Sequence, residues 1–287
     1  MSMMSKGTAK HVIAYYWDDF DPVVLLYDSE DKSVERLNLT YLDFSASRDK
    51  TCVGMMEDDE YIPCPQQVKL TKNATCLRCS PPAIPRLECI FEPRCTGERC
   101  SSPPFCTRPH VVYLALYSNL IKVGMTSEKR FKERITEQGA DAASIIFTCE
   151  NRLEARKLEK EVSKRFKIPQ DIKPGILMKQ WVTASSMQQM QNVYNTYLQR
   201  INAWHNTLNN DLSTFDRYPI TARPKSPPKI VRSEGKHVGE VMGIKGRFLV
   251  YNTPKGARAL DLSDLVGRML FFNVNNDSKE RERLYTQ

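Results

Sequence analysis

The chain has 287 residues, 41% of them hydrophobic and 26% charged, a composition that excludes wholesale disorder and allows two or three compact units. Lys and Arg outnumber Asp and Glu by 42 to 34, and the formal net charge of +8 favours polyanionic partners. No apolar run reaches the roughly 18–20 residues of a membrane span, and the N-terminus lacks the apolar stretch of a signal peptide, so we expect a cytoplasmic protein without membrane association.

The first region, residues 1–51, alternates β-favouring runs with acidic or turn-rich breaks. This alternation predicts a small antiparallel sheet. The next region, residues 52–109, is rich in Pro and Cys and poor in aliphatic side chains. Such a segment buries too little apolar surface to order itself, so a bound ion must hold it in place.

Seven of the nine cysteines lie between residues 64 and 106. Cys76 and Cys79 form a CxxC pair, whose spacing lets both thiolates bind one ion with tetrahedral geometry. Clustered cysteines in a protein without an export signal are typical of metal sites rather than of disulfides. The sequence therefore predicts structural zinc, with ligands drawn from Cys64, Cys76, Cys79, Cys89, Cys95, Cys100 and Cys106.

Other interpretations of the cysteines carry less weight. A thioredoxin-like redox pair would lie between a strand and the start of a helix, whereas Cys79 is followed by Ser-Pro-Pro. An iron–sulfur cluster would accept the same thiolates and stays open as an alternative. Cys52 stands outside the cluster and Cys149 ends an apolar run typical of a packed strand, so neither is included among the ligands.

The central region, residues 110–214, contains both strand and helix patterns. Glu154 lies three residues after Asn151, which is the spacing of a capping box at the start of a helix. The predicted elements are a hairpin turning at Ser118 and Asn119, a helix over 128–138, a strand over 144–149 and a helix opened by Asn151. This β-β-α-β-α order, with small β units on either side, predicts the α+β fold class.

A further long helix is predicted over residues 184–208, where large apolar side chains recur at steps of three and four. Such a stripe usually faces a hydrophobic core, and its alternative use is the seam of a homodimer. The stripe consists of Met187, Met190, Tyr194, Tyr197, Ile201, Trp204 and Leu208.

Residues 215–236 are predicted to be an extended basic linker. Between Arg217 and Lys236 the chain has several prolines, six basic residues and one acid, a composition that disfavours a compact fold. We expect the linker to contact nucleic-acid phosphates through Lys225, Lys229, Arg232 and Lys236. Residues 237–287 contain β-rich pieces separated by Gly, Asn and Pro, which predict a last small β unit.

The landmarks of the central region follow one another in a specific order. Tyr113 lies on the first strand of the hairpin, Lys122 and Gly124 lie on the second, and Arg134 and Glu159 lie on the two helices that follow. This order resembles the GIY-YIG nuclease superfamily, in which a Gly-Ile-Tyr strand pairs with a Tyr-Ile-Gly strand. The first glycine of that pattern is replaced by Val111 and its second tyrosine by Lys122; some branches of the superfamily also have lysine there.

The resemblance implies a metal-dependent endonuclease acting on DNA or RNA. Glu159 would hold Mg²⁺ or Mn²⁺, and Arg134 would stabilise charge on the phosphate. Tyr113 would help to deprotonate the attacking water, and Lys122 would supply a second cation. The ordinary alternatives are a sheet tyrosine with a satisfied hydroxyl, an arginine paired with a nearby acid and a glutamate in a local ion pair.

The stretch from the cysteines to Glu159 is also similar to a prokaryotic family of unknown function that joins a Cys-rich segment to this type of domain. In that family a further CxxC precedes Cys76, whereas here Cys64 stands with Gln67 in the partner position. The resemblance therefore implies that one zinc site is incomplete or rearranged.

Three functions compete at this point. The leading hypothesis is a nuclease in which the zinc segment and the outer β units position the nucleic acid. Its rival is a module that binds nucleic acid without cutting it, on a decayed nuclease scaffold. The third is a protein-interaction scaffold that dimerises through the helix over residues 184–208.

Overall fold

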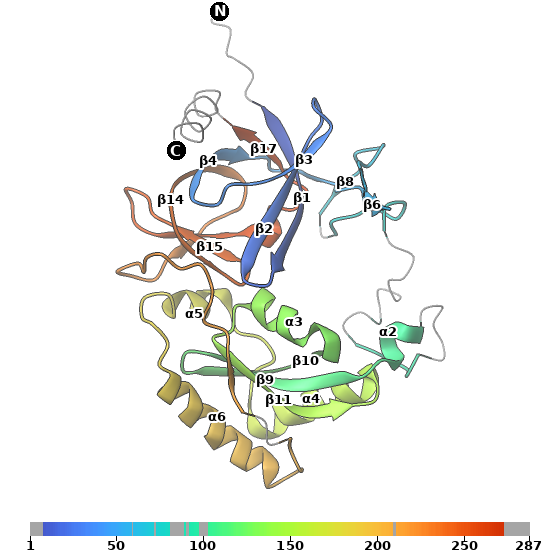
Figure 1. Cartoon of the computed structure of the whole chain (residues 1–287), viewed down its shortest axis with the longest axis vertical. Coiled ribbons are helices and arrows are strands. Elements are labelled where there is room, and N and C mark those ends of the chain that lie inside the picture. The colour runs from blue at the N-terminus through green and yellow to red at the C-terminus, as the bar shows by residue number, and fades with distance from the viewer. Residues whose placement is uncertain are drawn as a thin grey trace, which may run out of the picture.

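The computed structural model is a mixed α+β structure dominated by two sheets (Figure 1). It describes residues 8–58, 60–71, 73–80, 89, 92–97, 103–208 and 211–272. Within these ranges no helix is long and apolar enough to cross a membrane. Cys100, one of the predicted zinc ligands, lies outside the described ranges.

A nine-stranded sheet joins both ends of the described chain. Its strand order is β13-β16-β15-β14-β4-β17-β1-β2-β3. The strands are β1 (Ala9–Asp18), β2 (Asp21–Asp28), β3 (Ser33–Arg36), β4 (Tyr41–Ala46), β13 (Lys229–Ile230), β14 (Gly235–Lys245), β15 (Phe248–Tyr251), β16 (Arg258–Asp261) and β17 (Met269–Phe272). The meander β1-β2-β3 is the antiparallel sheet expected in the first region.

The two outer β units expected as separate bodies are parts of this one sheet. The first half of β14 pairs with β4 of the first region, and its second half pairs with β15 of the last. β17 lies between β1 and β4, antiparallel to both. The division into residues 1–51 and 237–287 is therefore wrong as a division of the fold, because strands that are remote in sequence complete each other's hydrogen bonds.

The basic segment over residues 215–236 also differs from an extended spacer. The Tyr218 side chain is buried, and its hydroxyl donates to the Ala140 carbonyl oxygen at 3.0 Å. Ile220 makes an isolated bridge with Gly243, and β13 pairs in parallel with β16. The segment packs along the body of the protein because its few apolar residues find places in the core.

The second sheet has four strands in the order β10-β9-β11-β12. These strands are β9 (His110–Tyr117), β10 (Leu120–Ser127), β11 (Ala142–Cys149) and β12 (Ser213–Thr214). Ser118, which turns the hairpin between β9 and β10, has a positive φ of 55°. The predicted hairpin and the strand that follows are thus confirmed.

Helices cover the four-stranded sheet and connect its strands. They are α2 (Pro103–Thr107), η1 (Glu128–Arg130), α3 (Phe131–Gln138), α4 (Arg152–Phe166), α5 (Pro174–Lys179) and α6 (Met187–Asn202), with η2 (Leu262–Asp264) in the larger sheet's last connection. At the start of α4 the Glu154 backbone N–H donates to Asn151 Oδ1 at 3.0 Å, as the capping pattern predicts.

The apolar stripe of the predicted long helix faces the core. Met190, Tyr194 and Ile201 of α6 are buried in one cluster with β9 and α4. Met187 and Leu208, at the two ends of the stripe, are exposed, and α6 ends at Asn202. The stripe is therefore explained by core packing within one chain, and dimerisation through this helix stays an untested prediction.

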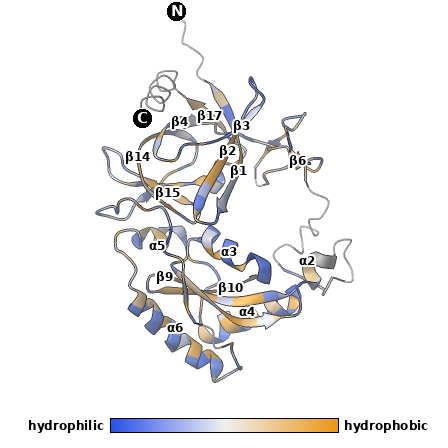
Figure 2. Ribbon diagram, in the orientation of Figure 1, coloured by the Kyte–Doolittle hydropathy of each residue, from blue (hydrophilic) through white to orange (hydrophobic). Residues whose placement is uncertain are grey.

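The two faces of the four-stranded sheet pack against different partners (Figure 2). Val112 and Leu114 of β9 face α4 and α6. Tyr113 and Ala115, which alternate with them, join a cluster that includes Leu42 and other residues of the nine-stranded sheet. Because side chains of a strand point alternately to opposite faces, one apolar strand connects both cores.

The β14–β15 turn lies directly against the end of α3. Gly139 caps α3 in the left-handed conformation, and a Cβ there would lie 2.8 Å from the Gly246 backbone nitrogen. Beside this contact Lys245 Nζ lies 2.6 Å from Asp141 Oδ1. The close approach of the two glycines brings one end of the larger sheet next to the helices of the smaller one.

Candidate functional site

Four cysteines come together in the Cys-rich region: Cys52, Cys64, Cys76 and Cys79. Their sulfur atoms all lie within 4.8 Å of one another. Cys76 is partly exposed and the other three are buried. A closed set of four thiolates suits a tetrahedral structural ion, as in zinc sites without an open coordination position. The structure thus contains a cysteine cluster suited to a metal such as zinc.

The backbone around these cysteines is shaped by short turns and one strand pair. The Gln67 N–H donates to the Cys64 carbonyl and the Cys79 N–H to the Cys76 carbonyl, so each cysteine begins a tight turn. The Cys76 N–H donates to Cys52 Sγ at 3.2 Å. Such N–H···S hydrogen bonds favour the thiolate form that a metal requires.

Cys52, which the sequence pattern alone leaves out of the candidate ligands, belongs to this cluster. Cys52 follows β5 (Lys50–Thr51), which pairs with β8 (Lys69–Leu70), and this pairing carries its sulfur to the other three. Cys52 supplies the fourth sulfur of the cluster, and position 67 is occupied by glutamine. β6 (Met55–Glu57) and β7 (Glu60–Ile62) form a second hairpin within the same region.

Three other predicted ligands, Cys89, Cys95 and Cys106, are not part of this cluster. Cys89 is partly buried, and its backbone carbonyl accepts a hydrogen bond from Arg152 at 2.6 Å. Cys95 and Cys106 are buried. In the described part of the chain these three do not form a further group with metal-ligand spacing. Cys149 is buried among the apolar residues of α4 and α6.

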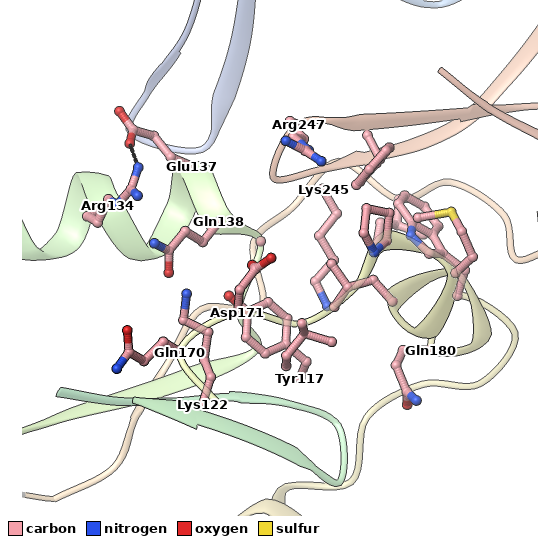
Figure 3. A pocket seen from close by; sticks show the side chains of 18 of the residues that line it. Tyr117, Lys122, Arg134, Glu137, Gln138, Gln170, Asp171, Gln180, Lys245 and Arg247 are labelled. Atoms are coloured by element: carbon pink, nitrogen blue, oxygen red, sulfur yellow. Dashed lines mark hydrogen bonds and ion pairs between the residues drawn. The ribbon is translucent and has the colours of Figure 1, made fainter. Parts of the chain in front are cut away.

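A cleft of about 470 Å³ lies between the four-stranded sheet, α3, α4, α5 and the β14–β15 turn (Figure 3). Three of the four predicted catalytic residues, Lys122, Arg134 and Glu159, line it. Lys122 comes from β10, Arg134 from α3 and Glu159 from α4. The structure thus brings side chains from three separate elements to one cavity.

Tyr113, the fourth predicted residue, is buried beneath the cleft. Its hydroxyl donates to Gln138 Oε1 at 3.1 Å, and Gln138 lines the cleft. Burial raises the pKa of Tyr113 to about 12, against the opposing effect of the nearby Arg134. Gly124 pairs with Tyr113 across the hairpin, and the absence of a side chain there leaves room for the ring. Tyr113 is therefore a neutral hydrogen-bond donor at neutral pH.

Lys122 is buried along its stem, with its side chain directed toward Gln138 in the cleft (Figure 3). The pKa of Lys122 is lowered to about 8, mainly by burial and also by Arg134, while Asp171 and Glu159 act in the opposite direction. Among the residues that the structure describes, its ammonium group has no hydrogen bond or ion pair. Asp171 is exposed and follows Pro169, whose carbonyl accepts from the Val123 N–H at 3.0 Å.

Glu159 is 5% exposed and forms an ion pair with Arg156, whose Nη1 lies 2.6 Å from Glu159 Oε2. The same guanidinium donates to Gln170 and to Glu92 of the Cys-rich segment. Burial raises the pKa of the Glu159 carboxyl, although Arg156 and Lys122 act in the opposite direction. Its other oxygen, Oε1, makes no hydrogen bond in the described part of the chain.

Arg134 pairs with Glu137 of the same helix, at 3.2 Å between Nη1 and Oε2. Both side chains are partly exposed, so this pair contributes little stability, and both residues line the cleft. Glu159 therefore has an arginine partner, and this partner is Arg156 of its own helix, not Arg134.

Several residues that line the cleft are not among the residues predicted from the sequence. Arg156 lies three residues before Glu159, a helical spacing that could have identified the pair. Arg223, Lys245 and Arg247 come from the segment after residue 215, and only the tertiary fold brings them to the cleft. The predicted phosphate contacts Lys225, Lys229, Arg232 and Lys236 are exposed and are not part of the cleft lining.

The fold and these sites define a mixed α+β protein with a cysteine cluster suited to a metal and a separate, mostly cationic cleft. A family model described as "Protein of unknown function (DUF2797)" matches residues 40–267, and the chain belongs to this family. The matched range contains the four clustered cysteines and the cleft. The expected membership in a family of unknown function is confirmed. No curated protein and no solved structure matches the chain.

Proposed function

We propose that the cleft is a GIY-YIG-type nuclease site, which hydrolyses phosphodiester bonds of nucleic acid with the help of a divalent cation. The observation that carries the proposal is the meeting of Lys122, Arg134 and Glu159 around one cavity, above the Tyr113 ring that packs on Gly124. Each of these residues alone has an ordinary structural explanation. Their convergence from a hairpin and two helices favours a shared chemical role.

The cations of the cleft are suited to a phosphodiester. Lys122, Arg134 and Arg156 line one end of it and outnumber the carboxylates of Glu159 and Glu137 there. In a cavity that excludes most water, such cations bind a phosphate and stabilise the charge that develops on it during hydrolysis. Lys122 is the best placed of the three, because no carboxylate of the described residues engages its ammonium.

The pKa values bear on which group accepts a proton from water. Tyr113, with a pKa of about 12, is almost entirely a neutral phenol at pH 7, a form that is a poor base. Lys122, with a pKa of about 8, is mostly protonated at pH 7 and keeps the charge that binds the phosphate. Tyr113 then acts by holding Gln138 at the edge of the cleft.

Glu159 is the carboxylate that would hold a divalent cation. Mg²⁺ and Mn²⁺ take one or two protein carboxylates and fill their other positions with water and substrate phosphate. Oε1 of Glu159 is compatible with this, since Arg156 occupies only Oε2. When bound, the cation would stabilise negative charge on the leaving oxygen.

One observation favours a second function, in which the cleft binds nucleic acid without cutting it. The contact of 2.6 Å between Arg156 and Glu159 neutralises the carboxylate that the reaction needs. A buried pair of this kind is costly to separate, because each partner would be left as an uncompensated charge. The same cationic cleft would then serve for binding alone.

Cleavage assays distinguish the two functions. Purified protein is incubated with supercoiled plasmid and with single-stranded DNA and RNA, in Mg²⁺, in Mn²⁺ and without added divalent ion. The nuclease proposal expects metal-dependent cleavage that Glu159→Gln abolishes and Glu161→Gln, an exposed position on the same helix, leaves unchanged. Binding without cleavage would select the second function, and cleavage that survives in Glu159→Gln would contradict the assigned site.

A further inference from the structure

The cleft has two chemically different ends. One end is the polar group around Lys122 and Glu159 described above. The other end is walled by apolar side chains of α5 and of the segments that follow it, namely Leu177, Met178, Trp181, Ile220 and Phe248. Asp171 and Tyr117 lie between the two ends (Figure 3). The nuclease chemistry uses only the polar end, so the apolar end needs a separate explanation.

The apolar wall is held rigidly by the core behind it. Met178, Trp181 and Phe248 belong to one buried cluster with Val250 and Ala259 of the larger sheet. Each of the three is nearly buried and presents only part of its side chain to the cleft. Phe248 lies on β15, which pairs with β16 along its whole length, so this part of the wall is held in place for a flat apolar group.

One cation, Arg223, lies at the edge of the apolar end. Arg223 is exposed and donates from Nη1 to the carbonyl oxygens of Trp181 and Thr183, at 3.4 and 3.1 Å. Within the described residues it has no carboxylate partner. The neighbouring cations Lys245 and Arg247 are engaged by Asp141 and Asp261. Arg223 is therefore the cation of this end that remains for a ligand.

We infer that the cleft takes a single unpaired nucleotide, with its phosphate at the Lys122 and Arg134 end and its base against the apolar wall beside Arg223. A cavity of about 470 Å³ lies in the range of roughly 300–1,000 Å³ that holds small ligands. Bases inside a duplex are stacked and paired, so they cannot enter such a cavity unless they are unpaired first. Apolar contact with an unpaired base does not depend strongly on its identity.

The inference rests on the proposed phosphate-binding role of the polar end and adds the state of the nucleic acid. It applies to a nucleotide within a strand and to a free nucleotide, which share the same base and phosphate. The substrate expected from it is single-stranded, or carries an unpaired or extruded nucleotide. A nuclease that acts on the side of an intact duplex would have no use for the apolar end.

Binding measurements without added divalent ion test the base contact separately from cleavage. Calorimetry compares thymidine 5′-monophosphate with 2-deoxyribose 5-phosphate, which lacks the base, and with orthophosphate. We expect the nucleotide to bind at least tenfold more tightly than the sugar phosphate. Equal affinities, or no binding of the nucleotide at millimolar concentration, would overturn the inference even if the protein proved to be a nuclease.

A second measurement tests whether the bound nucleotide must be unpaired. A labelled single-stranded oligothymidylate bound to the protein is competed with unlabelled oligothymidylate or with relaxed, covalently closed plasmid at equal nucleotide concentration. The single strand should compete at least tenfold better. Equal competition by the duplex would overturn the inference, whereas binding without any nicking activity would leave it standing and reject only the nuclease proposal.

Two substitutions locate the base. Leu177→Asn makes the apolar wall polar, and Arg223→Gln removes the rim cation; each should weaken nucleotide binding several-fold and leave sugar-phosphate binding unchanged. Arg36→Gln, an exposed cation outside the cleft lining, is the matched control. Thermal melting checks that Leu177→Asn is folded, and Arg223 is exposed enough for its replacement to be tolerated. Wild-type nucleotide affinity in the Arg223→Gln protein and in a folded Leu177→Asn protein would contradict the placement.

Discussion

The packing of the Tyr113 ring on Gly124 predicts how Gly124→Ala changes the free energy of unfolding. The sign of that change depends on whether the ring is present. A Cβ at Gly124 would lie 2.5 Å from both Cζ and Oη of Tyr113, about 0.9 Å nearer than the 3.4 Å at which ordinary contact begins. The ring has little room to retreat, because it is 1% exposed and packs edge-on against Phe131 at 5.6 Å. The Gly124 backbone itself lies outside the left-handed region, so alanine is not excluded by φ.

Two opposing effects set the size of the change. Alanine in place of glycine within a strand usually stabilises by about 0.5–1 kcal/mol, and overpacking a filled core costs about 1–3 kcal/mol. We therefore expect Gly124→Ala to lower the free energy of unfolding by about 1–2 kcal/mol in the wild-type background. In a Tyr113→Leu background, where the ring is absent, the same substitution should instead stabilise by about 0.5 kcal/mol.

Urea unfolding of the four proteins, followed by circular dichroism, completes this double-mutant cycle. A coupling energy of about 1.5–2.5 kcal/mol between positions 113 and 124 is expected, within the range found for residues in contact. If Gly124→Ala has the same effect in both backgrounds, the contact with Tyr113 is not the reason for glycine at this position. The resemblance of the hairpin to the nuclease pattern would then lose its structural basis.

Further predictions concern the metal, pH and salt. Cys52→Ser should lower the zinc content measured by elemental analysis as much as Cys79→Ser does, while Cys149→Ser should leave it unchanged. Full zinc retention in Cys52→Ser would contradict the assigned cluster, and iron in place of zinc would contradict zinc as its metal. Because the folded-state pKa of Lys122 is about 8, below its ordinary value of 10.5, its ammonium costs stability below about pH 8, and this cost disappears as pH rises toward 10.5. Oligonucleotide affinity should fall over the same rise in pH as the charge is lost, and Lys122→Arg, which stays charged, should remove this step in a pH titration. Neutralising Lys225, Lys229, Arg232 and Lys236 together should flatten the salt dependence of nucleic-acid binding, since fewer counterions are released; an unchanged slope would show that these exposed residues do not contact phosphates.

Much of the local structure could be predicted from the sequence. The turn at Ser118 and the capping of α4 by Asn151 are encoded by adjacent residues, and both are present in the structure. The apolar stripe of α6 predicts its buried face, because residues three and four apart lie on one side of a helix. The separation of Lys122, Arg134 and Glu159 onto a strand and two helices follows from the same local rules.

The sequence by itself thus determined the secondary structure of the central region and the presence of a cysteine cluster suited to a metal. Tertiary structure alone decided that Cys52 joins Cys64, Cys76 and Cys79, because strand pairing between β5 and β8 brings it there. It also decided that β14 joins both ends of the chain in one sheet, and that the β14–β15 turn closes one side of the cleft. Two strands can form hydrogen bonds however far apart they lie in the sequence. The residue pattern of one strand therefore does not identify the strand with which it pairs.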